Sequence, residues 1–118
     1  MAVATQHAVD MDAIERLRER LHLGREDFAR IIGVNPSTEW RWRHGLAAPR
    51  GLAQSRLVQF TELGGLLRRV FAGPDLAREW LTTARPATLG GRDTPLDVMR
   101  DGRIDRVVAT LDYLARGA

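Results

Sequence analysis

Apolar residues recur along most of the chain at steps of three and four, the spacing that places them on one face of a helix. The first such stripe begins at Met11 and the last ends at Leu114. The alternation that marks strands never lasts longer than a few residues. The pattern therefore predicts an all-α fold of six or seven helices in two small units. The expected helices cover residues 11–21, 25–32, 36–43, 52–71, 76–81, 94–101 and 104–114.

Glycine, proline and capping residues divide this pattern into helices. Asn35 followed by Pro36 is a helix-start signal, because asparagine caps free N–H groups and proline lacks the N–H that would need a partner. Thr94-Pro95 has the same form. Gly64-Gly65 interrupts the longest stripe, so we expect either a kink or a close helix contact there. Residues 82–93 lack a clear period and are expected to form the one long loop.

Residues 24–44 have the spacing of a helix-turn-helix motif. Ala29 lets two helices approach closely, Gly33 permits a tight turn at positive φ, and Trp42 faces inward to close the small core. With Trp42 inward, helical spacing leaves the opposite stripe free to enter a DNA major groove. The residues of that stripe are Ser37, Trp40, Arg41 and His44.

The predicted DNA-reading face lies on the second helix of this motif. Its candidate residues are Asn35, Ser37, Trp40, Arg41, Arg43 and His44. Arg41 suits a bidentate contact to guanine, whereas Arg43, Arg50 and Arg56 suit the phosphate backbone on either side. Between residues 34 and 60 four arginines stand against one acid. The alternative is that these arginines form only a solvated face.

Glu39 departs from the helix-turn-helix pattern. Its position usually holds a β-branched apolar residue that packs on the core, so a glutamate there counts against DNA binding. We expect the Glu39 carboxylate either to reach solvent past its own stem or to pair with Arg30.

Composition narrows the class of protein further. The chain has 118 residues, of which 44% are hydrophobic and 28% charged, as in a folded globular protein rather than a disordered one. All 18 basic residues are arginine, and with 15 acidic residues the formal net charge is +3, which permits an anionic partner without requiring one. The lack of cysteine excludes disulfides and thiol chemistry. No membrane-spanning run or signal peptide is recognised, so we expect a cytoplasmic protein outside the membrane.

The sequence offers little for catalysis. His7, His22 and His44 are scattered, and none has a partner at metal-ligand spacing. There is no lysine for a phosphate loop or a Schiff base, and Ser37 and Ser55 lack an adjacent histidine base. We therefore expect no enzyme activity, no metal and no cofactor.

A specific series of residues marks the second half of the chain. It runs through Trp80-Leu81, Pro86, Leu89-Gly90-Gly91, Thr94-Pro95-Leu96-Asp97, Gly102 and residues 107–111. In this order the segment resembles the toxin-binding domain of Xre/MbcA/ParS-type antitoxins, and the resemblance covers about residues 12–116. It implies a flexible N-terminus over residues 1–10, an Xre-like helix-turn-helix domain with a long linking helix over 11–72, and a toxin-binding domain over 73–118.

The resemblance implies an antitoxin of a type II toxin–antitoxin system, partnered by a RES-domain toxin that degrades NAD or transfers its ADP-ribose. Such an antitoxin would cover the toxin's active-site cleft, repress its own operon by binding operator DNA, and act as a homodimer within a larger complex. Because an NAD cleft presents cationic groups, acids of the last two helices are expected partners, with arginines in the reverse role. The candidate toxin-binding residues are Arg85, Gly90, Gly91, Arg92, Asp97, Arg100, Asp101 and Arg103. Asp97 is also expected to cap its helix.

Two other functions fit the same residues. One is a stand-alone helix-turn-helix repressor whose C-terminal unit only dimerises, which would bind its operator without any toxin. The other is an assembly module with a decayed helix-turn-helix, which would bind the toxin but no upstream DNA.

Overall fold

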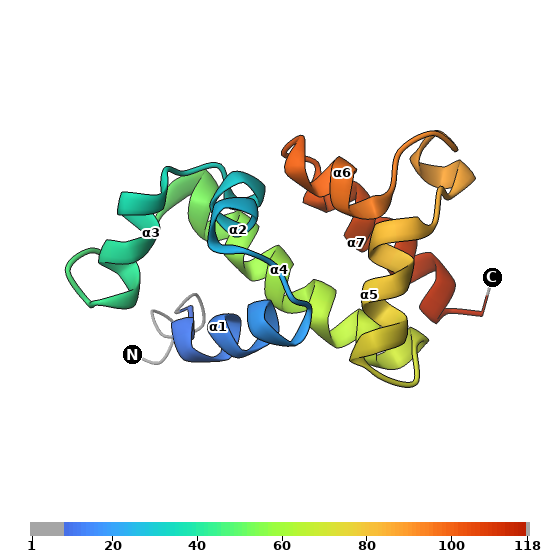
Figure 1. Ribbon diagram of the computed structural model, residues 1–118, viewed down its shortest axis with the longest axis horizontal. Coiled ribbons are helices and arrows are strands. Elements are labelled where there is room, and N and C mark those ends of the chain that lie inside the picture. Colours follow the sequence, from blue (N-terminus) through green and yellow to red (C-terminus); the bar gives the residue numbers. More distant parts are fainter. Residues whose placement is uncertain (1–8, 118) are drawn as a thin grey trace.

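A computed structural model describes residues 9–117, and within them the fold is all-α, as the apolar spacing predicts (Figure 1). The elements are α1 (Met11–Arg20), α2 (Arg25–Ile32), α3 (Pro36–Arg43), α4 (Gly51–Val70), α5 (Pro74–Thr83), the short 3-10 helix η2 (Ala87–Leu89), α6 (Pro95–Arg100) and α7 (Ile104–Ala115). Nearly all of the predicted flexible segment, residues 1–10, lies outside the described residues. No described helix combines the length and the apolarity that a membrane crossing needs.

The predicted loop over residues 82–93 is more ordered than expected. α5 continues to Thr83, and the hydroxyls of Thr82 and Thr83 donate to carbonyl oxygens one turn back, at 2.9 and 2.7 Å. Further on, η2 places Leu89 in the core with 4% of its surface exposed. The segment is therefore not one irregular loop: it contains the end of α5 and the helix η2, which the buried Leu89 holds against the core.

α4 is the central helix, against which four of the other helices pack. Its buried face consists of Leu57, Phe60, Leu63, Gly64 and Leu67. α1 and α2 contact α4 from the N-terminal side of the chain, and α5 and α7 contact it from the C-terminal side. Figure 1 shows α4 running from beside α2 and α3 to the turn that leads into α5.

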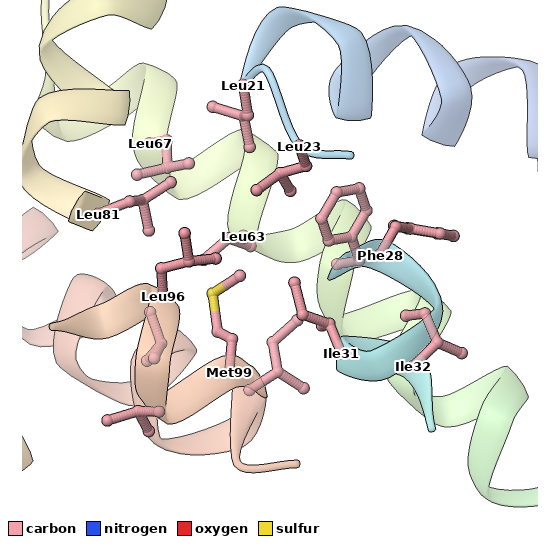
Figure 2. Close-up of a cluster of buried hydrophobic side chains, with 14 of the residues drawn as sticks. Leu21, Leu23, Phe28, Ile31, Ile32, Leu63, Leu67, Leu81, Leu96 and Met99 are labelled. Carbon is pink, nitrogen blue, oxygen red and sulfur yellow. The ribbon is translucent and has the colours of Figure 1, made fainter. Parts of the chain in front are cut away.

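The buried core is shared by both halves of the chain. Figure 2 shows Leu63 of α4 among side chains of α2 and of α6, with Phe28 on one side and Leu96 and Met99 on the other. All belong to one continuous hydrophobic cluster. The two predicted domains, divided between residues 72 and 73, therefore share one hydrophobic core. That they have separate functions stays a prediction.

Gly64 lets α1 lie close against α4. A Cβ at this position would stand 2.6 Å from Leu17 Cδ2, closer than real Cβ contacts. α4 is a single helix across Gly64-Gly65. Of the two expectations for this pair, the close helix contact is confirmed.

Arg56 of α4 turns inward and joins the two halves of the molecule. Its guanidinium donates to the carbonyl oxygen of Ile32 at 3.2 Å and to that of Gly102 at 3.4 Å. Carbonyl groups at the end of a helix have no hydrogen-bond donor within that helix. Arg56 provides this donor for Ile32 at the end of α2 and for Gly102 just past α6. Gly33 lies directly against the Arg56 guanidinium, where a Cβ would clash. Arg56 therefore has a role within the fold, and its place beside a DNA backbone stays a prediction.

Arg78 of α5 makes a second connection of the same kind. Its guanidinium donates to the carbonyl oxygens of Leu21 and His22, just past the end of α1. The Leu21 carbonyl has no following helical turn to accept from, so α5 completes the end of α1.

Candidate functional site

α2 and α3 meet as their sequence predicts. Ala29 is buried between helices, Gly33 has a left-handed backbone with φ of +88°, and Trp42 is 7% exposed. Asn35 caps α3, because its Oδ1 accepts a hydrogen bond from the Thr38 amide at 2.9 Å. These contacts fix which face of α3 points outward.

The outward face of α3 carries an aromatic pair and an unpaired arginine. Trp40 and His44 are exposed and stack with ring centroids 3.9 Å apart, and His44 Nδ1 lies 2.8 Å from the Trp40 carbonyl oxygen. Ser37 donates to Asn35 Oδ1 at 2.7 Å. Arg41 is exposed, and its side chain forms no hydrogen bond or ion pair with any other described residue. The predicted DNA-reading side chains other than Arg43 are thus exposed, with Arg41 free to contact a partner.

Glu39 is buried, with 2% of its side chain exposed, and it pairs with two arginines. Its Oε2 accepts from Arg43 Nε at 2.7 Å, and its Oε1 lies 3.9 Å from Arg25 of α2. Both expectations for Glu39 are wrong. Its carboxylate is too deeply buried to reach solvent, and Arg30 lies 4.0 Å from Asp101 instead of pairing with Glu39. Arg43 is correspondingly half-buried and turned away from the exposed face of α3.

The ion pairs of Glu39 continue into α1 through Glu15. Arg25 donates to Glu15 Oε2 at 2.7 Å, and Arg18 donates to the same oxygen at 2.6 Å. The hydrogen bond from Arg18, supported by that from Arg25, lowers the pKa of Glu15 to about 2 against the opposing effect of burial. A chain of alternating charges therefore ties α1, α2 and α3 together.

Among the candidates in the second half, Arg100 is committed to contacts within the molecule. Its guanidinium donates to both carboxylate oxygens of Asp27, at 3.1 and 2.9 Å, and to Asp97 at 3.2 Å. The residue that caps α6 is Thr94, whose Oγ1 accepts from the Asp97 amide at 3.2 Å. Asp97 therefore acts at this helix end through its backbone amide, and its carboxylate serves Arg100.

Asp101 and Arg103 lie in the turn between α6 and α7 and face solvent. The Asp101 side chain is 66% exposed, with only the long 4.0 Å approach of Arg30 beside it. Arg103 pairs with Asp105 at 3.2 Å, and both side chains are at least half exposed. Surface pairs of this kind contribute little to stability, so Asp101 and Arg103 remain available to a partner.

The remaining candidates lie on the other side of α6, around η2. Arg85 donates through Nε to the Arg92 carbonyl oxygen at 2.9 Å, which closes this segment on itself. Gly90 and Gly91 have φ of +94° and +72°, and nothing lies within 4 Å of where their Cβ atoms would be. The segment therefore presents open backbone that a partner can approach closely.

An apolar groove that the sequence did not predict lies at the end of α7. The groove has a volume of about 350 Å³ and is lined by Trp80, Pro86, Thr110, Tyr113 and Leu114, among others. Tyr113 is 55% exposed. The available signal was an aromatic residue off the apolar stripe of the last helix. No group of three His, Asp or Glu residues in the described part of the chain is placed to hold a metal ion.

Comparisons with known proteins identify the family. A model of the antitoxin Xre/MbcA/ParS C-terminal toxin-binding domain matches residues 66–117. The mycobacterial cidal antitoxins MbcA of Mycobacterium tuberculosis H37Rv and of Mycobacterium bovis are each 32% identical over 99 residues, covering 84% of this chain and 85% of theirs. A chain in the crystal structure of the M. tuberculosis MbcT–MbcA toxin–antitoxin complex has a TM-score of 0.64 and 30% identity, covering 89% of this chain and 92% of that one. Since both halves are matched, the chain belongs to the Xre/MbcA/ParS family of antitoxins.

Proposed function

We propose that this chain neutralises a cognate toxin in the cytoplasm by covering the toxin's active-site cleft with its C-terminal helices. The observation that carries the proposal is the fold shared over 89% of the chain with one solved in a toxin–antitoxin complex. The segment that the family model matches, residues 66–117, includes α5, η2, α6 and α7. Its role is therefore binding, with no catalytic step of its own.

The partner in this proposal is a RES-type toxin that consumes NAD, as the sequence resemblance implies. A cleft that holds the NAD pyrophosphate carries cationic groups, and these would favour exposed acids on the antitoxin. Asp101 meets that requirement at 66% exposure. Arg92 is exposed and its guanidinium forms no hydrogen bond or ion pair with another described residue, so it suits an acid of the toxin. Asp97 and Arg100 serve the fold first, because they are already paired.

The groove beside Tyr113 supplies the apolar anchor that a stable complex needs. Interfaces concentrate their binding energy in a few buried aromatic and arginine residues near the centre. Tyr113 and Leu114 are exposed apolar side chains in the family-matched segment, next to the groove and to η2. We place the centre of the toxin interface there, with the charged candidates at its rim.

We propose a second role for the same chain, the repression of its own operon as a homodimer. α2 and α3 would act as a helix-turn-helix, with Arg41 reading a base edge and Arg50 on the phosphate backbone. Both arginines are exposed, and neither side chain forms a hydrogen bond or ion pair with another described residue. The alternative, a stand-alone repressor whose C-terminal unit only dimerises, shares this DNA-binding step and lacks the toxin.

Co-expression with the adjacent gene product tests the antitoxin role. We expect that product to arrest growth alone and to be tolerated when this chain is present. Tyr113→Ala is expected to lose protection, whereas the control Leu76→Ala, an equally exposed apolar residue on α5, keeps it. Point variants are preferable to deletion of residues 73–118, because deletion would expose the shared core around Leu63 and Leu67. A neighbour that is harmless alone would contradict the proposal.

A further inference from the structure

A pocket of about 290 Å³ lies between α1, the C-terminal half of α4 and the start of α5, and none of the residues proposed to contact DNA or toxin lines it. Its walls include Leu17, Leu67, Phe71 and Ala77. Small-molecule sites in proteins are mostly apolar cavities of about 300 Å³ and larger with a few charged or polar groups. This pocket is at the lower end of that range, which suits a small ligand.

Two arginines line the pocket on its solvent side, Arg20 of α1 and Arg68 of α4. Both are exposed, and neither side chain forms a hydrogen bond or ion pair with any described residue. No acidic residue lines the pocket. The site therefore combines apolar walls with positive charge that the fold leaves unneutralised.

This combination separates the pocket from two other depressions on the surface. The groove between α4 and α7 is lined by Glu62, Asp105 and Asp112 as well as Arg69, so its charge is mixed. The groove beside Tyr113 has one arginine, Arg85, which is engaged with a backbone carbonyl. Only the pocket at Arg20 and Arg68, among these three, pairs an apolar interior with two unpaired cations.

We propose that this pocket binds a small amphipathic carboxylate, with the alkyl chain against the apolar walls and the carboxylate between Arg20 and Arg68. A guanidinium forms strong, charge-assisted hydrogen bonds to a carboxylate, and each buried methylene adds hydrophobic stabilisation. A nucleotide fits less well, because its ring nitrogens would face leucine, phenylalanine and alanine side chains that offer no hydrogen bond.

The ligand would touch both halves of the chain. Arg20 and Leu17 belong to α1, whereas Ala77 belongs to α5, in the segment that the antitoxin family model matches. A molecule bound to both would stabilise the folded state by mass action. Such binding requires neither the toxin nor DNA.

The test titrates the full chain with octanoate, decanoate and dodecanoate below their micelle-forming concentrations, using calorimetry and thermal unfolding. Decanol and decylamine serve as uncharged and cationic probes of the same chain length. We expect affinity to rise with alkyl length and the carboxylate to raise the melting temperature, while decanol binds at least about tenfold more weakly and decylamine shows no binding.

Two double variants of equal charge make the test specific. Arg20→Gln with Arg68→Gln is expected to weaken decanoate at least about tenfold. Arg16→Gln with Arg69→Gln changes two exposed arginines on the same two helices, outside the pocket, whose side chains form no hydrogen bond or ion pair with a described residue. This variant is expected to bind decanoate as the native chain does. Equal weakening by both pairs, equal binding of decanol, or no binding of any carboxylate at millimolar concentration would overturn the proposal. None of these outcomes bears on toxin neutralisation, which co-expression measures separately.

Discussion

Arg100 of α6 donates hydrogen bonds to both carboxylate oxygens of Asp27 in α2, with Nε–Oδ1 and Nη2–Oδ2 distances of 3.1 and 2.9 Å. The two residues lie far apart in sequence, and the pair joins the helix before the α2–α3 turn to the family-matched C-terminal segment. Arg100 lowers the pKa of Asp27 through this hydrogen bond. The contact links the region proposed to bind DNA to the region proposed to bind the toxin.

Replacing Arg100 with glutamine is expected to lower the free energy of unfolding by about 1 kcal/mol at neutral pH, since both partners are partly exposed. A carboxyl whose pKa is lowered by folding stabilises the fold above its unfolded pKa, and this contribution is lost as the pH falls through the folded value. The difference between the variant and the native chain should therefore shrink in acid. Urea unfolding of both proteins, from neutral pH into acid, measures this difference in unfolding free energy. Arg103→Gln, which breaks only the exposed pair with Asp105, should cause no measurable loss, and an equal loss in both variants would contradict this account.

Glu39→Gln is expected to destabilise the chain by about 2 kcal/mol, because it breaks a buried ion pair. The cost falls short of that for a fully buried pair, since Arg25 and Arg43 are 44% and 21% exposed and can reach water. Chemical unfolding is the measurement. Glu62→Gln, on the exposed side of α4, is the matched control and should leave stability unchanged. If Glu39→Gln were as stable as the control, the ion pairs would not hold α3.

Acid should weaken the α1–α2–α3 charge network through Glu15. Its pKa falls from 4.5 to about 2, chiefly because of the hydrogen bond from Arg18. The stabilising contribution is therefore complete above about pH 4.5 and is lost as the pH drops towards 2. Unfolding free energies measured over this window should fall more steeply for the native chain than for Glu15→Gln. Parallel curves would show that Glu15 has no lowered pKa.

Local signals in the sequence predict much of this fold. The capping pairs Asn35-Pro36 and Thr94-Pro95 begin α3 and α6 where expected, and Gly33 adopts the left-handed turn that its position requires. These features depend only on residues within one helical turn. For the same reason the all-α class and the helix order follow from apolar spacing alone.

The arginines could not be assigned in the same way. Arg56 and Arg100 are indistinguishable in sequence from surface arginines, but their partners, such as Gly102 and Asp27, come from helices brought near by tertiary packing. Glu39 has one partner at helical spacing, Arg43, and another, Arg25, that only the packing of α2 against α3 supplies. A residue type that serves carboxylate, phosphate and carbonyl alike needs the fold to choose among them.

Arg41→Ala tests the DNA-binding role. We expect it to cost about 1 to 3 kcal/mol in operator affinity and to relax preference at one base position, because a bidentate base contact is lost. Fluorescence anisotropy with the upstream DNA and with single-base variants measures both. Arg16→Ala removes another exposed arginine, from α1, and controls for net charge. Matching losses in the two variants would show that Arg41 contributes only general charge.

Direct titration of the purified cognate toxin with this chain, with NAD consumption followed in the same samples, tests the central claim. The account predicts a stable complex in which NAD consumption stops. It further predicts that Tyr113→Ala weakens the complex by about tenfold or more, while Leu76→Ala binds as the native chain does. A toxin that keeps consuming NAD when fully bound, or a complex equally strong in both variants, would contradict it.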